Sequence, residues 1–222
     1  MKTIGVLGGM GPESTVYVYK KMIEFCQKEY GAKYDSDFPQ IVIYNLPVPD
    51  VVENKGNEEY IIERLKFGME KLEAAGADFS FIACNSMEKF VPELRKRWSL
   101  LSIVEETAKE IDSKGIRKVG LLATDTTIRS NVYQQAMKGI SLILPKNQEE
   151  ITAAIMEILE GKKEEPNKKI LKSIEEFNRL GIDAIILGCT DLPVAIKQDE
   201  STVILIDSAE IIAKAAIKKC FQ

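Results

Sequence analysis

The chain has 222 residues, of which 45% are hydrophobic and 29% charged, and its formal net charge is -4. This length supports a substantial core without metal or disulfide help, and the composition excludes disordered, collagenous and membrane-spanning classes of protein. The basic residues are scattered among acidic ones on predicted helices, so the charge pattern indicates neither a nucleic-acid partner nor a membrane partner.

The sequence contains four cysteines and no histidine. The cysteines show no CxxC pairing and the N-terminus shows no secretory signal, so we expect free thiols and a cytoplasmic location. Without histidine a zinc site would need an unusual ligand set, and we predict no metal. Acid–base chemistry near neutral pH must then use cysteine, carboxylate or lysine.

In the first half of the chain, strands and helices alternate. Residues 2–7 are predicted to form a buried strand that ends in a glycine turn, and a helix follows from about Pro12 to Tyr30. The apolar pattern then predicts strands at 40–46, 79–83 and 100–103, and helices at 58–75, about 91–98 and 104–113.

The same pattern restarts near Arg117. It predicts strands at 117–124, 140–144, 184–188 and 203–206, and helices at 128–137, 149–159, 169–180 and 209–219. Such alternation favours parallel sheets with crossover helices, and the repetition favours an α/β fold of two flavodoxin-like halves related by a pseudo-twofold axis. We assign residues 1–98 with 208–222 to the first half, and residues 99–207 to the second.

One stretch of sequence occurs twice, at 79–86 and at 184–191, and each copy ends a predicted strand with a cysteine. Cys84 and Cys189 therefore occupy equivalent positions. Because ligands bind outside the carboxyl ends of parallel strands, we expect both thiols to face one cleft between the halves. The other two cysteines, Cys26 and Cys220, lie on predicted helices and receive no role.

Four motifs in order, at 8–15, 83–86, 124–127 and 187–193, make the chain resemble the aspartate/glutamate racemase superfamily, most closely its aspartate racemase branch. The resemblance implies racemisation without a cofactor. One cysteine thiolate removes the α-proton of an amino acid, and the opposing thiol returns a proton to the other face. It also implies a homodimer.

The resemblance also implies roles for residues around the thiols. Asp191 would tune the second cysteine, although it could equally be a turn cap. The strand-to-helix turns should give the thiols partial thiolate character, with one proton shared between them. The residues expected to bind substrate are Met10, Asn85, Ser86, Thr124, Thr127, Thr190 and Lys162.

Three positions depart from the family pattern. Val51 stands where the aspartate racemases have an arginine, and Leu159 falls in the register of their lysine, unless a shifted loop brings Lys162 or Lys163 there. Glu88 replaces a frequent histidine, and we expect it to be a solvated residue. Losing both cations would leave a substrate's side-chain carboxylate unpaired, so we hypothesise that specificity has moved away from aspartate.

Two alternatives remain open. The same two thiols could serve hydantoin racemisation or a cis–trans isomerisation, and the chain could be an amino-acid-binding module without turnover. A nucleotide site is disfavoured because Ser14 breaks the GxGxxG register after the first glycines.

Overall fold

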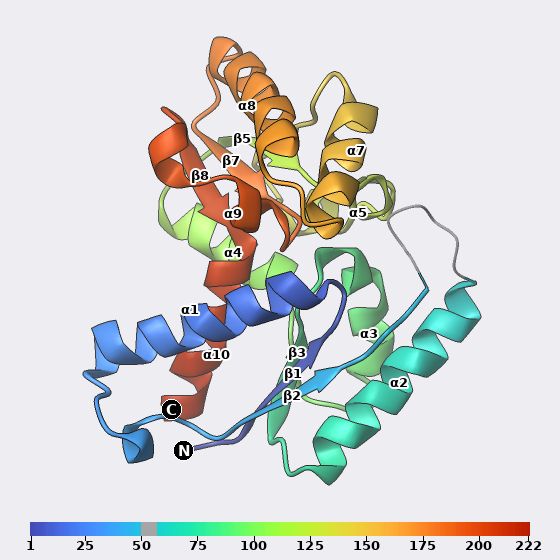
Figure 1. The fold of residues 1–222 in the computed structure, drawn as a ribbon, viewed down its shortest axis with the longest axis vertical. Helices are drawn as coiled ribbons and strands as arrows, with labels where there is room; N and C mark the ends of the chain where they lie inside the picture. Colours follow the sequence, from blue (N-terminus) through green and yellow to red (C-terminus); the bar gives the residue numbers. More distant parts are fainter. Residues whose placement is uncertain (50–56) are drawn as a thin grey trace.

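The computed structural model describes residues 1–49 and 57–222, and within them it confirms the predicted α/β fold (Figure 1). Two four-stranded parallel sheets have the same strand order, β2-β1-β3-β4 and β6-β5-β7-β8. Each strand of the second sheet thus corresponds to the strand four earlier. The first sheet contains β1 (Ile4–Gly8), β2 (Ile41–Asn45), β3 (Phe79–Ile82) and β4 (Leu100–Leu101), and the second contains β5 (Lys118–Leu122), β6 (Ser141–Ile143), β7 (Ala184–Leu187) and β8 (Ile204–Asp207).

Helices cover both sheets (Figure 1). Those that follow the strands of the first sheet are α1 (Pro12–Tyr30), α2 (Glu58–Ala74), α3 (Val91–Leu94) and α4 (Ile103–Ser113), with short 3-10 turns η1 (Asp35–Asp37) and η2 (Asn85–Phe90). The second sheet is accompanied by α5 (Asp125–Arg129), α6 (Val132–Ala136), α7 (Gln148–Leu159), α8 (Glu164–Arg179), α9 (Leu192–Ala195) and η3 (Gln198–Glu200), and the described chain closes with α10 (Ser208–Phe221).

Helix α10 connects the two halves. It begins at the carboxyl end of β8, capped by Asp207 Oδ1, which accepts hydrogen bonds from the N–H groups of Ala209 and Glu210 at 2.9 and 3.0 Å. It then runs back beside α1, so that both chain ends lie close together (Figure 1). There, Lys2 N–H donates a hydrogen bond to the Cys220 carbonyl at 3.3 Å.

One buried apolar cluster crosses from half to half. It contains Phe81 of β3 and Ile212 of α10 together with Leu121 and Ile186 of the second sheet. β4 pairs with β3, so Leu100 and Leu101 lie in the first sheet although our predicted boundary assigned them to the second half. The division into domains otherwise stays a prediction.

Three predicted helices differ from those observed. The predicted helix 128–137 is two short helices, α5 and α6, because Asn131 adopts a left-handed conformation with φ of 56°. α8 begins at Glu164 rather than near 169, because Pro166 lies in its first turn, where a missing N–H costs nothing. Residues 85–94, finally, form a 3-10 turn that passes into the short helix α3.

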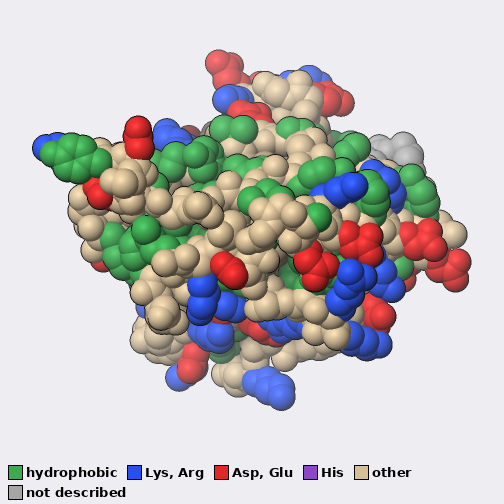
Figure 2. Space-filling view, turned by 90° about the horizontal axis from the view of Figure 1, so that it is seen from below, with side chains coloured by type: hydrophobic (Ala, Val, Ile, Leu, Met, Phe, Trp, Pro, Cys, Tyr) green, Lys and Arg blue, Asp and Glu red, His purple; other side chains and the backbone are tan. Residues whose placement is uncertain are grey.

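The surface carries both charge signs. Acidic and basic side chains are interspersed on the face shown in Figure 2. Several of them pair, as in the two-point contact of Arg95 with Glu105 at 2.5 and 2.8 Å. In the part of the chain that the structure describes, no helix combines the length and apolarity needed to cross a bilayer.

Candidate active site

The glycine turn after β1 is shaped by Thr15. The Thr15 hydroxyl accepts a hydrogen bond from Gly9 N–H and donates to the Gly11 carbonyl, both at 2.9 Å. Gly9 has φ of +91°, and a Cβ there would lie 2.8 Å from Leu46 N, so only glycine fits. The turn places Met10 at the carboxyl edge of the first sheet.

Cys84 and Cys189 occupy equivalent positions in the two sheets. Leu7 pairs with Ile82 in the first sheet as Leu122 pairs with Leu187 in the second, and each cysteine follows two residues later. The thiols are 6% and 7% exposed. Both line one cavity of about 300 Å³, whose other described lining residues are Gly9, Met10, Gly11, Pro12, Val48, Pro49, Ser86, Thr124, Leu159 and Asp191.

Three hydroxyl groups form a closed triangle beside the cavity. Ser86 Oγ lies 2.9 Å from Thr124 Oγ1 and 3.1 Å from Thr127 Oγ1, and the two threonine oxygens are 3.0 Å apart. Thr124 also caps α5 by accepting from Thr127 N–H at 3.2 Å. The triangle joins η2 of the first half to α5 of the second, and two of its residues, Ser86 and Thr124, line the cavity.

Asn85 and Thr190 brace the two cysteine loops against each other. The Asn85 amide N–H donates to Ser208 Oγ at 3.1 Å, and that hydroxyl donates to the Leu187 carbonyl at 2.7 Å. The Asn85 amide oxygen accepts from Tyr133 Oη at 2.7 Å. In the reverse direction, Thr190 Oγ1 donates to the Ala83 carbonyl at 3.2 Å. Neither side chain is among the described residues that line the cavity. The sequence thus indicated that both residues lie near the site, but it did not indicate these hydrogen bonds.

Burial opposes thiolate formation at both cysteines. It raises the pKa of Cys84 to about 12, with the negative charge of Asp191 as the next cause, while hydrogen bonds from the Ser86 and Met87 N–H groups and the Ser86 hydroxyl lower it. Burial, Asp191 and Cys84 itself raise the pKa of Cys189 well above its ordinary value. Our expectation of partial thiolate character is therefore wrong for the unliganded protein. The helical segments after the cysteines are too short for a strong dipole to offset desolvation.

The surroundings of the two thiols nevertheless differ. Cys189 Sγ donates a hydrogen bond to Asp191 Oδ2 at 3.5 Å, which favours its protonated form. Both thiols receive backbone hydrogen bonds that favour the thiolate, from Ser86 and Met87 N–H at Cys84 and from Asp191 N–H at Cys189, but only Cys189 donates to a carboxylate. Burial raises the pKa of Asp191, and a hydrogen bond from Ser14 opposes the rise. Asp191 is thus a thiol partner rather than a solvated turn residue.

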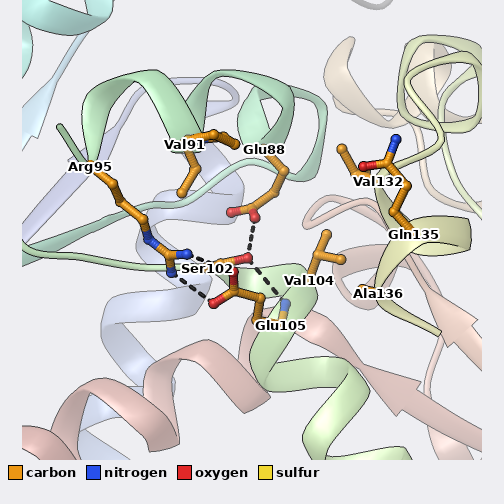
Figure 3. Close-up of a pocket in the computed structure, with 10 residues that line it drawn as sticks. Glu88, Val91, Arg95, Ser102, Val104, Glu105, Val132, Gln135 and Ala136 are labelled. Atoms are coloured by element: carbon orange, nitrogen blue, oxygen red, sulfur yellow. Dashed lines mark hydrogen bonds and ion pairs between the residues drawn. The ribbon is translucent and has the colours of Figure 1, made fainter. Parts of the chain in front are cut away.

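Glu88 is buried, at 4% exposure, and our expectation of a solvated residue is wrong. Its carboxylate accepts from the Ser102 hydroxyl and, at 3.1 Å, from Ile103 N–H, and so holds η2 to the start of α4. Figure 3 shows it pointing towards Ser102 beside a separate cavity of about 220 Å³. Burial raises its pKa from 4.5 to about 7.

The predicted cations do not reach the thiol cavity in the described structure. Lys162 has a side chain 58% exposed and pairs with Glu160 at 2.6 Å, and Lys163 pairs with Glu13 at 3.5 Å. Leu159 lines the cavity itself. Val51 lies outside the described residues. Within residues 1–49 and 57–222, no group of three or more Cys, Asp or Glu side chains could hold a metal ion.

Comparisons with known proteins agree with this geometry. The family model described as Asp/Glu/Hydantoin racemase matches residues 7–216. The broad specificity amino-acid racemase RacX of Bacillus subtilis is 33% identical over 219 residues, covering 96% of each chain. An aspartate racemase of Picrophilus torridus superposes with a TM-score of 0.89 at 28% identity, covering 100% of this chain and 95% of that one. An aspartate racemase homologue of Pyrococcus horikoshii OT3 gives 0.83 at 32% identity, covering 100% of both chains.

Proposed function

We propose, from the premise that the chain belongs to the Asp/Glu/hydantoin racemase family, that Cys84 and Cys189 are the two acid–base groups of a cofactor-independent amino-acid racemase. The observation that carries this proposal is their equivalent position at one cavity, each directly beyond the carboxyl end of a central strand. Substrate and product are mirror images at the α-carbon, and a pseudo-symmetric pair of thiols can exchange a proton with either enantiomer.

In the proposed reaction, one proton leaves the α-carbon of the substrate and another is added to its opposite face. A thiolate, on Cys84 in one direction, takes the α-proton and becomes a thiol, and the C–H electron pair stays on the substrate as a carbanion. The Cys189 thiol then gives its proton to the opposite face and becomes the thiolate. The hydrogen bond from Cys189 Sγ to Asp191 Oδ2 supports Cys189 as the proton donor in this direction, because it favours the protonated form of that thiol.

The substrate carboxylate is proposed to bind near the Ser86 and Thr124 hydroxyls, in a cavity whose lining also includes Met10. Hydroxyl and backbone donors there would stabilise the charge that spreads onto the carboxylate as the α-carbon loses its proton. Asn85, Thr127 and Thr190 would position these groups through their contacts, without touching the substrate.

Cysteine replacement tests the proposal. Cys84→Ser and Cys189→Ser should each lower racemisation by on the order of a thousandfold, since a hydroxyl is a far weaker acid–base group at neutral pH. Cys26→Ser, at a buried thiol away from the cavity, is the matched control and should retain turnover. If either active-site serine variant keeps full activity, the two-thiol proposal is wrong.

We also propose a homodimer and a cytoplasmic location. Exposed apolar side chains on α1 and the edge strand β2 support self-association, with Val16 67%, Tyr19 40% and Ile43 39% exposed. Sedimentation analysis of the parent protein and of a Val16→Glu variant tests the dimer, which the added charge should weaken. The four free cysteines are compatible with a reducing compartment.

A further inference from the structure

The cavity that holds the two thiols is lined by both polar and apolar groups. The polar groups are the thiols, the hydroxyls of Ser86 and Thr124, and the Asp191 carboxyl. Carbon-rich side chains make up most of the remaining described lining, namely Met10, Pro12, Val48, Pro49 and Leu159. A bound amino acid with its carboxylate at the hydroxyls and its α-carbon between the sulfurs would have these apolar side chains to pack its own side chain against.

Leu159 contributes to this lining from the second half of the molecule. It is the last residue of α7, and its Cδ2 lies 2.8 Å from the position that a Cβ on Gly11 would occupy. The missing side chain at Gly11 therefore lets α7 approach the glycine turn. Leu159 is 41% exposed, and a bound apolar side chain would cover part of it.

The charges around the cavity disfavour a second carboxylate. No Lys or Arg is among the described residues that line it, whereas Asp191 is. Lys163, the nearest cation in sequence to Leu159 after Lys162, is paired with Glu13 at an exposed site. Against the described lining residues, a side-chain carboxylate would lose water without gaining a cationic partner, and an apolar side chain would not suffer this loss.

We infer that the substrates are amino acids with uncharged, apolar side chains of about the size of methionine or leucine, and that Leu159 determines this specificity. This inference rests on the proposed racemase function. The inference goes beyond that function, because a two-thiol racemase could equally select aspartate.

The first test compares substrates by incorporation of deuterium at the α-carbon in D2O. With parent protein, kcat/KM for methionine or leucine should exceed that for aspartate and glutamate by roughly a hundredfold or more. A preference for aspartate, glutamate, lysine or arginine would overturn the inference and leave the racemase proposal standing.

Measurements of binding distinguish the specificity inference from the racemase proposal. Calorimetry on the Cys84→Ser/Cys189→Ser double variant measures selectivity without turnover. Tighter binding of methionine than of aspartate supports the inference even if no amino acid is racemised by the parent, and equal or reversed affinities contradict it.

The second test replaces Leu159 in the wall of the cavity. Leu159→Lys adds a cation to the cavity wall, and the kcat/KM ratio of aspartate to methionine should rise at least about tenfold. Leu159→Met keeps the length of the side chain without charge and is the matched control, so the ratio should stay within about threefold of the parent. An unchanged ratio in Leu159→Lys would show that Leu159 does not determine specificity.

Discussion

At the level of single residues, thiol acidity is the chief chemical difficulty. Both sulfurs are buried next to a carboxyl, and both effects favour the neutral thiol. A substrate α-ammonium group would supply a positive charge beside the sulfurs, and so would favour the thiolate when it binds. Burial and Asp191 thus favour the neutral thiols in the free protein, and we expect the ammonium group of a bound substrate to favour formation of the thiolate base.

Asp191→Asn should make both thiols more acidic, because it removes the negative charge that raises their pKa values. The effect should be larger at Cys189, which also loses the hydrogen bond to the carboxylate. Ultraviolet thiolate absorbance against pH, measured in Cys84→Ser and Cys189→Ser backgrounds, reports each sulfur separately. Asp199→Asn, at an exposed acid, is the control, and a rise in either thiol pKa would contradict the assignment.

Glu88 should make stability depend on pH. Its pKa is raised from 4.5 in the unfolded chain to about 7 in the folded one, so its contribution is fully present below 4.5 and is lost as the pH rises through 7. Relative to Glu88→Gln, the parent should lose on the order of 3 kcal/mol of unfolding free energy across that interval. Urea titrations of both proteins at several pH values measure the difference, and parallel pH curves would contradict it.

At the level of elements, short segments after β3 and β7 carry the two cysteines proposed to react, and contacts from the other half hold these segments. Tyr133 on α6 fixes Asn85, which adjoins Cys84. Most strands and the paired cysteines followed from the sequence, because apolar runs and an internal repeat are local patterns. Tyr133 and Ser208 did not, because their partners lie 48 and 123 residues away in the chain.

Tyr133→Phe should lower both stability and turnover. It leaves the buried Asn85 oxygen without its 2.7 Å donor, at a cost of about 1–3 kcal/mol. It also loosens the loop that carries Cys84, so kcat should fall more than KM rises. Tyr60→Phe, on the exposed side of α2 at 49% exposure, is the matched control. A stable variant with unchanged kcat would show that Asn85 needs no support from α6.

The surroundings of Glu88 and Leu159 could not be predicted from local sequence patterns. A glutamate at the start of a helical turn is usually solvated, and only the approach of α4 buries this one. Leu159 ends an amphipathic helix and has no local feature that marks a cavity wall, so only the family register indicated its position, and its place in the wall depends on the glycine turn of the other half. The sequence thus predicted the equivalence of the two cysteines, whereas the groups around them depend on how the halves pack.

At the level of the whole molecule, the shared apolar cluster and α10 should make the two halves unfold together. Trp98, the single tryptophan, packs against the cluster of the first half, so its fluorescence reports that half, while circular dichroism reports the whole chain. Ile155→Ala removes a fully buried side chain from the core of the second half and should cost about 2–5 kcal/mol. Both signals should shift to lower denaturant by the same amount. If the Trp98 transition stays in place while the dichroism transition splits, the halves are independent, and the site between them could not be held by their mutual packing.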